Sequence, residues 1–283
     1  MSSLPARQPA APAGRRARAG RGPREPDGDQ RRRYSRGQVA ALRVTAGVAI
    51  LAAWQICATA FAPNYIPRPS RTAAQIPSVL SNPQFLSGAA STLLAVIEGL
   101  LIAVLAGTVI GLVMGRVRDV DRALRLYVNS FYAMPIVALV PLLTVWFGYT
   151  PNARLAVVVL EAALPIIFNV AEGGRNVSAS YVDVARAYRA PWWRVWTSVA
   201  LPASLPYLLG GIDLAIGRAL IGAVVAEFIA ALNGAGYYIL FNVRSFHQDD
   251  AVVAVGVLIA FVLALRGLVN LAVRRGLPWY QAA

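Results

Sequence analysis

The chain contains no lysine, and all 27 of its basic residues are arginine. A P-loop of the form GxxxxGK[ST] is therefore impossible, so we expect no ATP-hydrolysing site of that kind. The GxSxG elbow, the HExxH zinc motif and the DxDxDG calcium loop are also absent. Paired carboxylates occur only in predicted loops beside arginines, where they are more often solvated charges than acid–base pairs. This inventory does not indicate an enzyme.

Cysteine and histidine are each present once, as Cys57 and His247. A disulfide framework, a CxxC site and a His-rich metal site are therefore excluded. Cys57 lies within an apolar run, where we interpret it as a small hydrophobic residue. His247 lies in the polar stretch RSFHQDD and is interpreted as a solvated loop residue. We expect the chain to bind no metal and no cofactor of its own.

Charge is scarce overall: 14% of the residues are charged and 57% are hydrophobic. A soluble domain carries about 25% charged residues, so this deficit, together with apolar runs near 20 residues, indicates an integral membrane protein. The net charge of +14 could suggest nucleic-acid binding, but eleven arginines lie at or before Arg43, ahead of the first apolar run. Such a tail is typical of a topology determinant on an anionic lipid surface. We predict no nucleic-acid partner and a disordered tail over residues 1–43.

Six apolar runs predict an all-α membrane protein with six transmembrane helices. Within the second run, Gly107, Gly111 and Gly115 recur at every fourth position, a pattern that lets two helices approach closely in lipid. The runs cover residues 44–62, 89–115, 126–147, 155–170, 203–231 and 251–273.

The arginines predict the orientation of the bundle. They crowd the N-terminal tail, the loops after the second and fourth runs, and the C-terminal end, whereas the alternate loops hold few. Positively charged loops favour the cytoplasmic side, so both termini and the fourth loop are predicted to be cytoplasmic.

The fourth loop is long and patterned. Ser180 and Asp183 fit a capping box at the start of a short helix over residues 181–190. Pro191 suits the first position of a second helix, which we expect to end near Leu201, before Pro202. The tryptophans at 192, 193 and 196 favour a membrane–water interface. The sequence thus predicts two short helices lying on the cytoplasmic surface.

Of the charged residues within the apolar runs, where a charge is costly and usually faces the interior of the bundle, five are candidates for function. Either they line a translocation path or they form ion pairs between helices. Asp213 and Arg218 are five residues apart on one helix, which is poor spacing for a pair, so at least one needs a partner elsewhere or water. The five are Glu98, Glu161, Asp213, Arg218 and Glu227.

The fourth loop resembles a known family. DVARAYRAPWWRVWTSVALP, residues 183–202, is similar to the cytoplasmic EAA loop of the inner-membrane permease subunits of binding-protein-dependent ABC importers. MPIVALVPLLTVWFG, GRALIGAVVAEF and the ending RRGLPWY resemble the nitrate, sulfonate and taurine import group. The resemblance covers residues 89–280, which would form the permease core, and leaves residues 1–43 and the first helix with its external loop, 44–88, outside it.

The resemblance assigns roles within the loop. The acidic position of the family falls on Asp183, followed by Val184 where alanine is usual and then by Ala185. The glycine of the family, which turns the chain between the two helices, falls on Arg189, and arginine resists the positive φ that glycine allows. We therefore expect Pro191 to restore the bend by other means. The resemblance implies that the coupling residues are Asp183, Val184, Ala185, Tyr188, Arg189, Ala190, Leu201 and Pro202.

The resemblance also implies partners and a substrate. Two permease copies would form the path in the bacterial inner membrane, and separate ATPase subunits would bind ATP and magnesium and hold the loop. A periplasmic or lipid-anchored binding protein would deliver a small anion such as a sulfonate, nitrate or taurine. Arg218 is the predicted anion-attracting charge, and Glu161, Asp213 and Glu227 are the other candidates for the path.

Two alternatives remain open on the residues alone. A secondary transporter or channel driven by ion gradients would account for the intramembrane carboxylates, but it predicts an inverted repeat that the sequence does not display. A membrane-anchored scaffold that uses its basic tail predicts no ATPase partner. Neither alternative gives the fourth loop a purpose.

Overall fold

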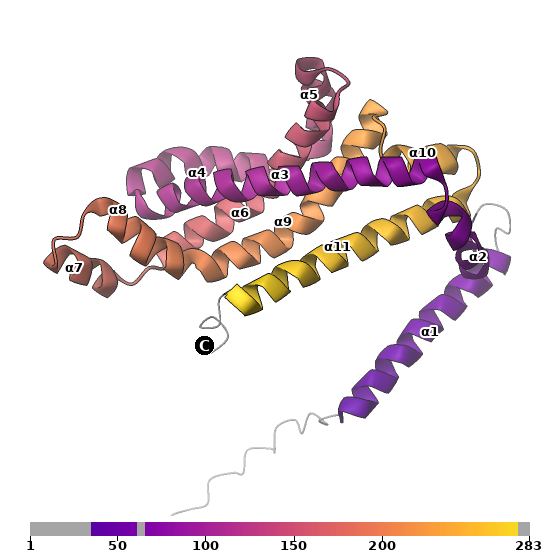
Figure 1. The fold of residues 1–283 in the computed structure, drawn as a ribbon, viewed down its shortest axis with the longest axis horizontal. Helices are drawn as coiled ribbons and strands as arrows, with labels where there is room; N and C mark the ends of the chain where they lie inside the picture. Colours follow the sequence, from indigo (N-terminus) through magenta and orange to yellow (C-terminus); the bar gives the residue numbers. More distant parts are fainter. Residues whose placement is uncertain (1–34, 61–65, 277–283) are drawn as a thin grey trace, which may run out of the picture. The chain divides into compact units, whose positions relative to one another are not determined.

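The computed structural model describes residues 35–60 and 66–276, and the regular structure of these residues is entirely helical. In chain order the elements of Figure 1 are α1 (Arg36–Ala60), α2 (Pro69–Leu80), α3 (Pro83–Arg116), α4 (Arg118–Ala133), the 3₁₀ helix η1 (Ile136–Leu139), α5 (Val140–Phe147), α6 (Pro151–Arg175), α7 (Ala179–Ala187), α8 (Trp192–Val195), the π-helix η2 (Trp196–Ala200), α9 (Leu201–Ala230), α10 (Ala235–Arg244) and α11 (Gln248–Gly276).

The chain divides into two units after Ile50. In the first unit the described residues form the beginning of α1, so residues 36–43 of the predicted tail are helical. The rest of that predicted tail lies outside the described residues, as do the last four residues of the predicted core, 277–280. The second unit holds the remaining helices, and the candidate site lies entirely within it.

Five helices in the described ranges are long and apolar enough to cross a membrane. The predicted third span is different, because α4 and the η1–α5 segment meet at a bend of 92°. Met134 precedes Pro135 and adopts an extended conformation with ψ of 134°, since proline disfavours the helical region in the residue before it. The described residues thus hold five candidate spans, or the predicted six if this bent pair crosses the membrane as one broken span and is not a re-entrant segment.

The core of the second unit lies between α3, α6 and α9. Its side chains are mostly small or β-branched, including Val158, Ile166 and Ala219, and all three are fully buried. The glycine stripe of α3 lies against α6: a Cβ on Gly111 would come within 2.8 Å of the Cβ of Val170, and one on Gly107 within 2.9 Å of the Cγ2 of Ile166. A Cβ on Gly115 would lie 2.6 Å from the carbonyl oxygen of Ala171. These contacts require glycine, because larger residues would push the helices apart.

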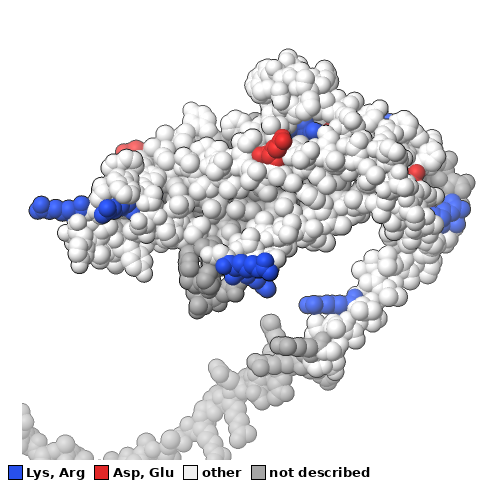
Figure 2. Space-filling model, in the orientation of Figure 1, with Lys and Arg blue, Asp and Glu red and all other residues white. Residues whose placement is uncertain are grey.

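Helix α9 connects two ends of this unit, and Figure 1 shows α7 and α8 at its start and α10 beyond its other end. We call them the α7 end and the α10 end. At the α10 end, α2, α3, α10 and α11 share a second apolar cluster around Val79, Phe85, Tyr238 and Leu258. On the face drawn in Figure 2, basic side chains gather at the α7 end and the flanks of the helices carry few charges.

Candidate functional site

The candidate coupling loop begins with α7. This helix starts at Ala179, so Ser180 lies inside it and is not its N-cap, and the predicted capping box is corrected. Tyr181, Val184 and Tyr188 are 65%, 56% and 84% exposed. Their spacing of three and four residues places them on one face around α7 and its following turn. The loop thus presents an apolar and aromatic stripe to its surroundings.

Arg189 ends α7 in an unexpected way. Its φ is 52°, in the left-handed region that favours glycine, although arginine was expected to resist it. The amide of Ala190 donates a 2.9 Å hydrogen bond to the carbonyl oxygen of Ala185, which is the six-to-one bond of a Schellman motif with Arg189 at its left-handed position. The expectation that Pro191 would replace this turn is wrong: arginine adopts the conformation itself.

The second short helix is not separate from the fifth span. Pro191 is the N-cap of α8 and not its first residue, and α8 continues through η2 into α9, so that residues 192–230 form one helix of 39 residues. The prediction of an end near Leu201 is therefore wrong. Pro202 has no amide hydrogen to donate to Ser198, and a π-turn is a common way for a helix to absorb such a missing bond.

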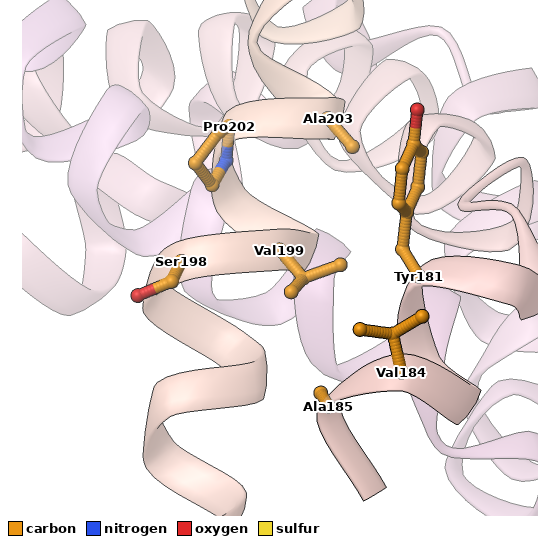
Figure 3. Close-up of a pocket in the computed structure, with 7 residues that line it drawn as sticks. All are labelled: Tyr181, Val184, Ala185, Ser198, Val199, Pro202 and Ala203. Atoms are coloured by element: carbon orange, nitrogen blue, oxygen red, sulfur yellow. The ribbon is translucent and has the colours of Figure 1, made fainter. Parts of the chain in front are cut away.

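A groove separates α7 from the start of this long helix (Figure 3). Its volume is about 420 Å³, and its lining is largely apolar. From α7, the side chains of Tyr181 and Val184 point toward Val199 and Ala203 across it (Figure 3). The predicted coupling residues Val184, Ala185 and Pro202 therefore line one groove together with Tyr181, Ser198, Val199 and Ala203.

Arg218 lies midway along α9, beside the bend of the broken span. Its guanidinium Nη1 is 3.2 Å from the Oε2 of Glu161 on α6, and its Cζ lies 4.9 Å above the ring of Tyr132 at the end of α4. The side chain of Arg218 is 39% exposed, whereas that of Glu161 is 12% exposed. The structure thus brings together Arg218 and Glu161, two of the four candidates for the path, and leaves part of the Arg218 side chain accessible.

Asp213 lies apart from this pair. Its carboxylate forms an ion pair with Arg266 on α11, and the Oδ1 of Asp213 lies 3.3 Å from the Nε of Arg266. The Nη2 of Arg266 also donates a hydrogen bond of 2.9 Å to the backbone carbonyl oxygen of Asp213. Asp213 and Arg218 therefore do not pair with each other, and each has a partner on another helix. Glu98 on α3 is exposed, and it borders a cavity of about 230 Å³ that Arg154 also lines near the α10 end.

Glu227 is fully buried at the α10 end. One carboxylate oxygen accepts from the hydroxyl of Thr92 at 2.7 Å and from Nη1 of Arg154 at 2.9 Å, and the other accepts from the amide of Gly236 at 2.7 Å. A Cβ on Gly234 would lie 2.1 Å from the Cδ of Glu227, so this glycine makes room for the carboxylate. Glu227 therefore caps the start of α10 and neutralises a buried arginine.

Sequence reasoning missed three members of this cluster. Arg154 was assigned to an external loop, but it lies in the first turn of α6 with 5% of its side chain exposed. Thr92 and Gly236 carried no motif. The closely spaced glycines 234 and 236, a few residues after Glu227, were the one available signal, because paired glycines permit a close approach of backbone to another group.

Metal chemistry finds no support in the described residues, which contain no group of three or more His, Cys, Asp and Glu side chains able to hold an ion. The arrangement instead offers paired charges between helices, an accessible guanidinium at mid-span and an exposed apolar helix at one end. These are features of a path and a docking surface.

Comparison with known proteins adds the family. Residues 82–276 match the family described as the binding-protein-dependent transport system inner membrane component. The chain is 34% identical over 180 residues to the putative aliphatic sulfonates transport permease protein SsuC of Bacillus subtilis, which covers 62% of this chain and 65% of that relative. The alignment thus spans just under two thirds of that relative.

Two further relatives are similar over more of the chain. The taurine transport system permease protein TauC of Escherichia coli is 28% identical over 241 residues, which is 82% of this chain and 86% of TauC. The formylaminopyrimidine transport permease protein ThiX of Halalkalibacterium halodurans is 28% identical over 236 residues, which is 81% of this chain and 92% of ThiX. The names of these relatives span aliphatic sulfonates, taurine and a formylaminopyrimidine.

Proposed function

Because this chain belongs to the inner membrane components of binding-protein-dependent transport systems, we propose that it forms the translocation path of an ATP-driven importer for a small anion and couples to a separate ATPase through α7. It is a multi-pass protein of the inner membrane, and its relatives are transport permeases, which are not enzymes themselves. In this proposal ATP and magnesium bind to the partner ATPase.

The exposed stripe of α7 is the observation that carries the proposal. Tyr181, Val184 and Tyr188 stay exposed although the first two border the groove beside the start of the long helix, and an exposed apolar helix face of this kind commonly docks into a groove of another protein. Asp183 lies on the same helix and is exposed. We assign the remaining coupling roles to Ala185, Arg189, Ala190, Leu201 and Pro202, which lie in the turn after α7 or near the groove between α7 and the long helix.

The path is proposed to run beside Arg218. A guanidinium binds sulfonate or carboxylate oxygens through paired hydrogen bonds, and the accessible part of Arg218 supports that role. Glu161 holds the arginine in place until an anion competes for it. Asp213 and Glu227, although charged, are engaged by Arg266 and Arg154, so we assign them a supporting role in the walls of the path.

The remaining partners follow from the family. We propose a second copy of the chain across the path, and a periplasmic or lipid-anchored binding protein that delivers the substrate at the α10 end. The α7 end would then be cytoplasmic, in agreement with the arginine distribution of the sequence. Substrate choice among aliphatic sulfonates, taurine and nitrate would rest with the binding protein.

Copurification with the ATPase subunit tests the proposal. The wild-type chain should retain the ATPase in detergent, and Tyr188→Ala should weaken that association by roughly thirtyfold, because a buried aromatic anchor at an interface contributes about 2 kcal/mol or more. Tyr149→Ala is the matched control, since Tyr149 is 75% exposed and lies two residues before the first residue of α6, at the α10 end. A wild-type chain that retains no ATPase would refute the coupling proposal and favour transport driven by an ion gradient.

A further inference from the structure

A polar cluster holds three helices together at the α7 end. Asp121, near the start of α4, is 9% exposed and is held by two arginines. Arg125 pairs with it from the next turn of α4, and Nη1 of Arg175, the last residue of α6, lies 3.1 Å from its Oδ1. One carboxylate thus joins the start of α4 to the end of α6.

The same cluster extends to α9. Nη2 of Arg175 lies 2.6 Å from the Oε2 of Glu172. The Oε1 of Glu172 accepts a hydrogen bond of 3.2 Å from the side-chain amide of Asn176. Asn176 also donates to the hydroxyl of Tyr207 on α9 at 3.1 Å. We call the set the α4–α6–α9 polar cluster; its members are Asp121, Arg125, Glu172, Arg175, Asn176 and Tyr207.

Close backbone packing makes this junction stiff. A Cβ on Gly173 would lie 2.9 Å from the ring of Tyr207, and one on Gly174 would lie 3.1 Å from the Cα of Gly115. The last turn of α6 is therefore pressed against both α9 and the end of α3. A displacement of this turn must move its neighbours or break these contacts, because packed interiors do not deform continuously.

The candidate coupling loop starts at this junction. Asn176 is the C-cap of α6, and α7 begins three residues later at Ala179. From the junction, α4 extends over 16 residues, about 24 Å at the usual helical rise, to the bend of the broken span. Tyr132, in the last turn of α4, lies beneath the guanidinium of Arg218. One rigid helix thus connects the base of the loop to the mid-span arginine.

We propose that Asp121 is a positioning residue for transport: it makes α4 move together with the end of α6, so that a force on α7 changes the position of Tyr132 beneath Arg218. The inference rests on the proposed coupling function of α7. Two discrete positions of α4, one for each state of the ATPase, would then alter how Arg218 is held. Without the link through Asp121, the loop could move while α4 stayed behind.

The charges of the cluster dictate which variants test it. A charge reversal at both Asp121 and Arg175 would not restore the link, because an arginine at 121 would face Arg125 and an aspartate at 175 would face Glu172. Asp121→Asn keeps the size and removes the charge. Arg175→Gln cuts the same link but leaves Asp121 paired with Arg125, so no buried charge loses its last partner.

The experiment measures transport and ATP hydrolysis together in proteoliposomes that contain the complete complex with its ATPase and binding protein. Asp121→Asn and Arg175→Gln should each lower the substrate imported per ATP by roughly fivefold or more, the usual lower range of coupling between sites. The double variant should be no worse than either single variant, and Asp121→Glu should restore most of the ratio. Asp119→Asn is the matched control, because Asp119 is 90% exposed and its ion pair within the described part of the chain is with Arg122 of the same helix.

Separate outcomes refute separate claims. If Arg175→Gln imports as much substrate per ATP as the wild type, the polar cluster only holds the helices together and the inference is wrong, whether or not Asp121→Asn folds. An equal loss in Asp119→Asn would also overturn it, since that pair spans no helix boundary. If the wild-type complex shows no ATP-dependent import, the proposed function itself fails, independently of the cluster.

Discussion

Glu227 offers the sharpest test of the energetics of the bundle. Its carboxylate is fully buried and receives three donors: the hydroxyl of Thr92, a guanidinium N–H of Arg154 and the amide of Gly236. Glu227→Gln keeps the shape of the side chain but supplies one acceptor oxygen and one NH₂ group. Because every surrounding group is a donor, the NH₂ group must face at least one of them.

The expected cost follows from the burial of the pair. The side chain of Arg154 is 5% exposed, so Glu227→Gln leaves a buried cation without its counter-charge. Removal of one partner of a buried ion pair typically costs about 3–5 kcal/mol. Arg154 retains the carbonyl oxygen of Asn233 at 3.1 Å and the hydroxyl of Ser91 at 2.9 Å, which favours the lower part of that range. We therefore expect a loss of about 3 kcal/mol.

Thermal unfolding of the purified protein in detergent measures this effect. The double variant Arg154→Met with Glu227→Gln should be less destabilised than Glu227→Gln alone, because it removes the orphaned cation. Glu161→Gln is the matched control: its partner Arg218 is 39% exposed, so water can solvate the freed guanidinium and the loss should be smaller. A Glu227→Gln protein as stable as the wild type, or a double variant with additive losses, would refute the reasoning.

Three further changes test other parts of the structure. Arg189→Gly should stabilise the end of α7 by about 1 kcal/mol in thermal unfolding, because a non-glycine residue in the left-handed region costs about that much; an unchanged protein would contradict the strained turn. Gly111→Ala should destabilise by about 1–3 kcal/mol through overpacking against α6, whereas Gly256→Ala, with open space around it, should not. Arg218→Gln should lower import of an anion by roughly tenfold, while Glu161→Gln should spare import or raise it; equal losses would make the pair purely structural.

The spans could be predicted from the sequence because hydropathy depends on local composition. Five of the predicted apolar runs correspond to long helices, with ends that differ by a few residues, and the loop after the fourth run does contain a short helix. The positions at which proline bends or interrupts a helix were harder to predict. Pro135 bends the third span by 92°, whereas Pro202 and Pro206 lie inside the long helix that ends at Ala230. Proline removes one donor in every case, and the surrounding packing decides whether a bend, a π-turn or a nearly regular helix results.

The turn after α7 shows a second limit. The family pattern placed a glycine at position 189, and from residue preference alone arginine predicted a different turn. The structure keeps the left-handed turn and accepts the strain, because the hydrogen bond from Ala190 to Ala185 and the return of the chain toward α8 both require that geometry. The geometry of this loop was therefore more predictable from the family pattern than from the preference of the residue in it.

The partners of the buried charges could not be predicted from the sequence. The cost of a charge within the membrane requires that each have a partner or water, and the spacing of five residues correctly argued against a pair between Asp213 and Arg218. It could not name Arg154, which is 73 residues from Glu227 in the chain, or Glu161, which is 57 residues from Arg218. These distances reflect the packing of α6 against α9, and the register of that packing is set by glycines and alanines that carry no charge signal. Partner identity is therefore a property of helix register, and a substitution such as Gly211→Ala, which would press α9 against Ile166 of α6, should weaken ion pairs that it does not touch.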